Sequence, residues 1–124
     1  MDRQTIFQYV KQQYGTEPEY LWLKYPSYAV LRRQDNQKWY GIVMNVPREK
    51  LGLPGTDVVD ILDVKCEPTL ADFLRQSPGF FPGYHMNKKT WVSILLDGTV
   101  SDECIFDLLD ASFQAAADKR KKAK

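Results

Sequence analysis

The sequence has little of what most catalytic and metal-binding sites require. Among its 124 residues there is one histidine, His85, and there are two cysteines, Cys66 and Cys104, far apart in apolar surroundings. A single imidazole without paired thiols or a nearby carboxylate pair does not match a metal site, and no glycine pair matches a phosphate-binding loop. We therefore expect no metal, no cofactor and no enzymatic activity, and we interpret both cysteines as reduced thiols of a cytoplasmic protein.

Long apolar runs and a strong net charge are also missing. No apolar segment approaches the roughly 20 residues of a membrane-spanning helix, so we expect no membrane partner. The 17 basic and 16 acidic residues give a net charge of +1. Five of the basic residues and one acidic residue lie in the tail at 118–124, so residues 1–117, with 12 basic and 15 acidic side chains, carry −3. A body of that sign is not typical of proteins that bind nucleic acid tightly and without specificity.

What the sequence does contain is a regular alternation of apolar and polar residues, which predicts one α+β domain over residues 1–118. Helical spacing occurs at 2–14, 69–77 and from 101 onward, and strand-like alternation occurs at 28–33, 38–46, 58–66 and 91–96, with a short edge strand expected within 80–89. Strands joined by short turns must be antiparallel. The sequence therefore predicts a two-layer sandwich with a five-stranded antiparallel sheet, helices on one face and the order α-β-β-β-α-β-β-α.

Side-chain alternation also predicts which residues lie on which face of the sheet. In the strand 38–46, Ile42 is expected on one face and Trp39 on the other. Together with Trp91, Trp39 would then offer a partly exposed aromatic surface. In the strand 58–66, Asp60 is expected opposite Asp63, on a solvated strand surface.

The second and third helices carry signals for their ends and for their buried faces. Thr69 is expected to cap the second helix, with Leu70, Phe73 and Leu74 turned inward. Ser101 is expected to begin the third helix. The inward stripe of the third helix is predicted at Ile105, Leu108, Leu109, Ser112, Phe113 and Ala116.

The most distinctive segment runs from Pro82 to Trp91, with the sequence PGYHMNKKTW. It combines the only histidine with a lysine pair and two aromatic residues that have a polar edge. Aromatic stacking contributes roughly 1–3 kcal/mol per base, and neighbouring cations can hold phosphates, so the segment is a candidate nucleic-acid surface. Lys24-Tyr25-Pro26 precedes the first predicted hairpin and has a similar composition. The candidate binding residues are Arg32, Arg33, Tyr84, His85, Asn87, Lys88, Lys89 and Trp91.

The same segment also has a purely structural interpretation. His85 and Asn87 can satisfy backbone groups in an irregular edge segment, while Lys88 and Lys89 keep that edge from pairing with another molecule. The two interpretations make different demands on the structure. Binding requires the cationic and aromatic side chains to converge on one face beside a concavity.

The motif from Pro82 to Lys89, followed by Trp91, Leu96-Asp97-Gly98 and Ser101-Asp102-Glu103, resembles the MmcQ/YjbR family. The resemblance extends over most of the chain and departs at Thr90, where many members are expected to have a histidine. It implies an α-β(3)-α-β(2)-α fold akin to frataxin-like and secretion-chaperone-like domains. Members of the family are described as DNA-binding, and the motif positions carried over are Tyr84, His85, Met86, Asn87, Lys88, Lys89 and Trp91.

Two functions follow as hypotheses. The first is a non-enzymatic module that binds DNA weakly and in a salt-sensitive manner through the face with Lys88 and Lys89. The second is an adaptor that binds a protein or a small ligand on the exposed sheet face, with Trp39 and Trp91 as anchors. A small enzyme centred on His85 stays open as a third possibility. We expect a monomer or a weak homodimer.

Overall fold

The computed structural model describes residues 1–117 of the 124-residue chain. It contains one five-stranded antiparallel sheet with the strand order β1-β2-β3-β5-β4. The predicted α+β fold and its element order are confirmed, whereas the basic tail at 119–124 lies outside the described residues. None of the helices described is long and apolar enough to cross a membrane. The elements are α1 (Arg3–Tyr14), β1 (Ala29–Arg32), β2 (Trp39–Pro47), the 3-10 helix η1 (Arg48–Leu51), β3 (Val58–Lys65), α2 (Pro68–Leu74), β4 (Phe80–Pro82), β5 (Trp91–Leu95) and α3 (Asp102–Ala115).

The two long helices begin at polar residues that satisfy their first backbone amides. The Asp2 carboxylate accepts a hydrogen bond from the amide of Thr5 at 2.8 Å, and the Ser101 hydroxyl accepts one from the amide of Cys104 at 3.2 Å. Gly15 ends α1 in the left-handed conformation, with φ 67°, which glycine adopts without steric penalty. The predicted start of the third helix at Ser101 is therefore confirmed, and Asp2 plays the same part for α1.

The short helix α2 differs from its prediction in two ways. It begins at Pro68, whose fixed φ suits the first helical position, so Thr69 lies inside the helix and does not cap it. The prediction that Leu70 and Phe73 face inward is wrong, because the side chain of Phe73 is 67% exposed and that of Leu70 38%. Leu74 is buried as predicted, Ala71 is buried with it, and in a helix of seven residues this single pair makes the contact with the core.

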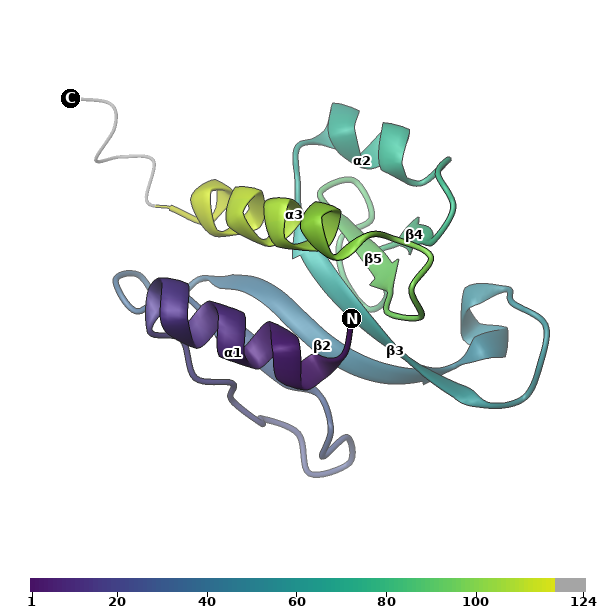
Figure 1. Ribbon diagram of the computed structural model, residues 1–124, viewed down its shortest axis with the longest axis horizontal. Helices are drawn as coiled ribbons and strands as arrows, with labels where there is room; N and C mark the ends of the chain where they lie inside the picture. The colour runs from purple at the N-terminus through teal and green to yellow at the C-terminus, as the bar shows by residue number, and fades with distance from the viewer. Residues whose placement is uncertain (118–124) are drawn as a thin grey trace.

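Figure 1 shows α1 and α3 side by side on one face of the sheet. The helix-side core lies between these helices and the strands, with Ile6 and Val10 from α1 and Ile105 and Leu109 from α3 all fully buried. The stripe predicted for α3 faces this core, with Leu108 and Phe113 only partly buried. At the far end of α1, Tyr14 and Phe113 stack with ring centroids 3.7 Å apart.

A β-bulge in β2 changes which side chains reach the other face of the sheet. Leu31 pairs with Gly41 and Arg32 pairs with Trp39, so Tyr40 is an extra residue in β2. The fully buried Tyr40 packs in the helix-side core, where its hydroxyl donates to the Thr16 hydroxyl at 2.7 Å. The bulge interrupts the alternation, and Trp39 therefore lies on the same face as Ile42. The prediction that these two residues face opposite ways is wrong.

Candidate functional site

The face of the sheet opposite the helices has an apolar cluster of its own, covered by loops. We call it the loop-side cluster. Two loops account for most of the cover, at residues 20–28 and 83–89, and they contribute the partly buried side chains of Trp22, Tyr84 and Met86. The predicted exposed sheet face is therefore only partly open. The buried members of the cluster are Tyr28, Val30, Ile42, Met44, Val46, Ile61 and Leu95.

The first loop, 20–28, leaves and rejoins the sheet at the edge of β1. Glu19 and Val30 exchange two backbone hydrogen bonds, of 3.0 and 2.8 Å, which close the base of the loop. The loop's aromatic rings pack on one another and on β2. Tyr25 stacks on Tyr28 with centroids 4.6 Å apart, and Trp22 meets Trp39 edge to face at 5.8 Å.

The second loop, 83–89, is held by hydrogen bonds to β5 and within itself. The amide of Gly83 donates to the carbonyl of Trp91 at 3.1 Å, and the amide of Tyr84 donates to the Ser93 hydroxyl at 2.9 Å. His85 adopts a left-handed φ of 63°, which is uncommon for a residue with a side chain. Gln37, in the connection between β1 and β2, has the same φ, so this conformation marks a tight turn, and the turn leaves the His85 imidazole exposed.

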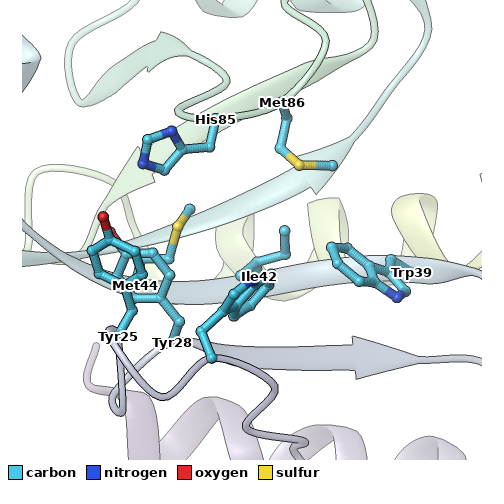
Figure 2. Close-up of a pocket in the computed structure, with 8 residues that line it drawn as sticks. Tyr25, Tyr28, Trp39, Ile42, Met44, His85 and Met86 are labelled. Carbon is cyan, nitrogen blue, oxygen red and sulfur yellow. The ribbon is translucent and has the colours of Figure 1, made fainter.

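Between the two loops lies an apolar cavity of about 260 Å³, the aromatic pocket. Its floor is β2, and Figure 2 shows His85 and Met86 on one side with the rings of Tyr25 and Tyr28 opposite them. Aromatic, aliphatic and thioether groups make up the rest of its lining, an arrangement typical of sites that hold an apolar ligand. The lining residues are Trp22, Tyr25, Tyr28, Trp39, Ile42, Met44, His85 and Met86.

A buried carboxyl group lies on the same face of the sheet, beside the pocket floor. Asp63 of β3 pairs with Ile42 on one side and Ser93 on the other, and its side chain is fully buried. One carboxyl oxygen accepts a hydrogen bond from Ser93, whose hydroxyl also accepts from the amide of Tyr84. The other oxygen, Oδ2, has no partner among the described residues. The prediction of a solvated Asp63 is wrong, because the loop 83–89 covers it, whereas Asp60 lies on the opposite face as expected.

Burial raises the pKa of Asp63 to about 8, although the hydrogen bond from Ser93 and the charge of Lys88 act in the opposite direction. The carboxyl group is therefore mostly protonated at neutral pH. The Lys88 ammonium does not neutralise it by a direct ion pair, since it donates to the carbonyl of Gly83 at 2.7 Å. Asp63 thus adds little negative charge to this face of the protein.

The structure does not bring Arg32 and Arg33 to the pocket. Arg32 forms a bidentate ion pair with Glu19 at the edge of the sheet, with distances of 2.6 and 3.1 Å. Arg33 pairs with Asp35 at 2.8 Å and lies over the ring of Phe113 at 4.0 Å, on the helix side. Each guanidinium is therefore matched locally, and the two arginines do not share a surface with the lysines of the 83–89 loop.

Some residues of the Pro82–Trp91 motif hold the loop in place, and others lie at the mouth of the candidate site. The Asn87 side chain accepts a hydrogen bond from the amide of Lys89 at 2.9 Å, and Trp91 is only 7% exposed. Asn87 and Lys88 therefore shape the loop, as the structural interpretation expects of Asn87. The prediction that Trp91 is a partly exposed anchor is wrong, because its side chain is buried. Tyr84 and His85 lie at the mouth of the site, and Lys89 is exposed. Six pocket residues lie outside the motif, namely Trp22, Tyr25, Tyr28, Trp39, Ile42 and Met44. The aromatic run from Tyr20 to Tyr28 is a signal for the first three, and the last three come from β2.

Among residues 1–117, no three His, Cys, Asp or Glu side chains come together as a possible metal site.

Comparison with known proteins finds similar sequences and structures that extend over most of the chain. The model of the YjbR family matches residues 11–115. The uncharacterized protein YyaQ of Bacillus subtilis (strain 168) is 50% identical over 113 residues, which cover 91% of this chain and 96% of YyaQ. The uncharacterized protein YjbR of Escherichia coli (strain K12) is 40% identical over 58 residues, 46% of this chain and 49% of that protein. A crystal structure of a Pseudomonas syringae protein superposes with a TM-score of 0.92 at 43% identity, covering 94% of this chain and all of the other.

Proposed function

We propose a binding function for this chain, which belongs to the YjbR family. In this proposal the protein is not an enzyme and holds a small apolar or aromatic group in the aromatic pocket. The observation that carries the proposal is the convergence of four aromatic residues from two separate segments on one cavity of about 260 Å³. The four aromatic residues are Trp22, Tyr25 and Tyr28 of the loop 20–28 and Trp39 of β2.

The chemistry of the lining supports binding rather than catalysis. His85 is the only titratable side chain in the lining besides the tyrosines, and no Ser, Cys, Asp or Glu of the described residues lines the pocket. A histidine that acts as a general base needs a nucleophile or a substrate proton within hydrogen-bond reach. We also propose that the protein is cytoplasmic, which is supported by the free thiols of Cys66 and Cys104.

Removing an aromatic wall of the pocket should weaken binding of a neutral apolar probe. We expect the dye N-phenyl-1-naphthylamine to bind with enhanced fluorescence, and Trp39→Ala to weaken its affinity by about tenfold, equivalent to about 1.4 kcal/mol. Met44→Phe, which places a ring in the cavity from its floor, should also reduce binding. The measurement is a fluorescence titration of each variant.

Phe73→Ala provides the matched control, because it removes an aromatic side chain that is 67% exposed and does not line the pocket. Its dye affinity should equal that of the wild type. Thermal unfolding of every variant separates loss of binding from loss of fold. Unchanged affinity in both Trp39→Ala and Met44→Phe would exclude the pocket as the binding site.

Weak, salt-sensitive DNA binding is the second candidate function. It is supported by the contact of the exposed His85 with Tyr84, whose ring centroids are 4.0 Å apart, and by the exposed Lys89 in the same loop. Arg32 and Arg33 are each paired with an acidic residue, so they do not add to this cationic edge. DNA binding is therefore less well supported than ligand binding in the aromatic pocket.

A titration with short DNA duplexes at low salt tests this second candidate. We expect Lys89→Ala to weaken binding, and the logarithm of the affinity to fall with the logarithm of salt at about 0.9 per phosphate contacted. No binding below about 100 μM, the weak end of the range for non-specific complexes, would remove it.

A further inference from the structure

The aromatic pocket shares its mouth with a wider groove that has a different chemical character. This groove has a volume of about 580 Å³, and Tyr25, Tyr28 and His85 line both it and the pocket. Lys24 reaches the groove from the loop 20–28, and Lys50 reaches it from η1. An apolar cavity therefore adjoins a more open space with two ammonium groups.

The positive charge of the groove is not matched by neighbouring acidic groups. The ion pairs found among residues 1–117 involve neither Lys24 nor Lys50. The adjacent Arg48, by contrast, pairs with Asp57 at 2.8 Å. No Asp or Glu of the described residues lines the pocket or the groove. The two lysines are therefore available to an anionic group from outside the chain.

Uncharged hydrogen-bond donors gather at the same place. Tyr25, Tyr28 and Tyr84 all line the groove, and the rings of Tyr25 and Tyr28 stack with centroids 4.6 Å apart. Figure 2 shows the hydroxyl ends of Tyr25 and Tyr28 on the side of the His85 imidazole. Hydroxyl and imidazole N–H groups are donors that an oxyanion can use.

We propose that the ligand is a small amphipathic anion. Its aromatic or aliphatic body occupies the aromatic pocket, and its carboxylate or phosphate lies in the groove near Lys24, Lys50 and His85. This inference rests on the proposed binding function and adds the chemical class of the ligand. A ligand of this class uses both spaces at once, whereas a neutral apolar molecule leaves the two ammonium groups without a partner.

The test compares probes with the same ring system and different head groups. The full ¹⁵N-labelled chain is titrated with 1-naphthylacetate, 1-naphthyl phosphate and the neutral 2-(1-naphthyl)ethanol, and the tryptophan indole N–H signals are followed by NMR. Trp22 and Trp39 report on the pocket, while Trp91, which does not line it, is an internal control. We expect at least one anion to bind about tenfold more tightly than the alcohol at low salt.

Matched lysine variants then locate the anionic group. Lys24→Gln/Lys50→Gln should abolish the advantage of the anions and leave the affinity for the alcohol unchanged. Lys11→Gln/Lys38→Gln, which removes the same charge outside the groove, should preserve the advantage.

The outcomes separate this inference from the proposed function. If the alcohol and the anions shift Trp22 and Trp39 with equal affinity, or if both double variants behave alike, the amphipathic-anion inference is overturned and the pocket stands. If no probe shifts these two signals, the proposed function itself fails.

Discussion

Asp63→Asn should flatten the dependence of stability on pH between pH 5 and pH 8. Burial raises the folded-state pKa of Asp63 to about 8, from an ordinary value of 3.8. Its contribution to stability is therefore fully present below pH 4 and is lost as the pH rises through about 8. Between these limits the group lowers the free energy of unfolding by up to about 1.4 kcal/mol per pH unit. Asparagine cannot ionise, so the variant lacks this slope.

The wild type should be the more stable protein at pH 5, and Asp63→Asn should be the more stable protein at pH 8. At pH 5 the variant is expected to be less stable by about 1–2 kcal/mol, because an amide NH₂ replaces the oxygen that has no partner. At pH 8 it is expected to be the more stable protein. Urea unfolding at a series of pH values measures both free energies.

Asp60→Asn is the matched control, since Asp60 lies in the same strand but on the helix side, where it pairs with Arg3 at 3.1 Å. This substitution should lower stability by a similar amount at pH 5 and pH 8. The pKa values of Asp2, Asp35 and Asp97 are lowered, in each case first by a hydrogen bond. These three groups stabilise the fold above about pH 4 and lose that contribution as the pH falls further, which is opposite in sign to the effect of Asp63. Parallel pH profiles for the wild type and Asp63→Asn would show that Asp63 is not held protonated.

Gly83→Ala should destabilise the protein by about 2–3 kcal/mol and also impair the pocket. A Cβ atom at this position would lie 2.7 Å from the Cβ of Trp91 and 2.9 Å from its carbonyl oxygen. Backbone atoms cannot move aside as a flexible side chain can, so β4 and β5 would have to separate. The Gly83 carbonyl also accepts hydrogen bonds from the amide of Met86 and from Lys88, and a shift would displace His85 with them.

Gly52→Ala separates this steric effect from the general cost of replacing a glycine. Gly52 has a left-handed φ of 75° but open space around it, so alanine there should cost about 1 kcal/mol. Its binding of the neutral dye should stay at the wild-type level, whereas Gly83→Ala should weaken it. A Gly83→Ala variant as stable as the wild type, with unchanged dye binding, would contradict the close contact with Trp91.

The fold was predictable because its signals are local. Ser101 caps α3, Gly15 ends α1, and the alternation in β3 continues without interruption, so the short connections required an antiparallel sheet. The position of Trp39 was not predictable from alternation. It depends on the bulge at Tyr40, whose hydroxyl meets Thr16, a residue 24 positions away in the sequence.

The candidate site was predicted only in part, because some of its signals are local and others depend on contacts between distant parts of the sequence. The His85 segment was found from its composition, because a histidine, two lysines and aromatic residues in one turn are unusual. The other wall of the pocket comes from the loop 20–28, which has no periodic pattern and takes its place from the Glu19–Val30 bridge. The burial of Asp63 likewise depends on a loop that follows it by some 20 residues, linked through Ser93 and the amide of Tyr84.

The most direct test of the pocket is an NMR measurement of close contacts between a bound probe and the methyl groups of Met44 and Met86. These methionines line the pocket from its floor and from the loop 83–89. With 1-naphthylacetate bound, we predict nuclear Overhauser effects from the naphthalene protons to both methionine methyl groups. Effects to residues elsewhere, with none to either methionine, would contradict the assignment of this cavity as the binding site.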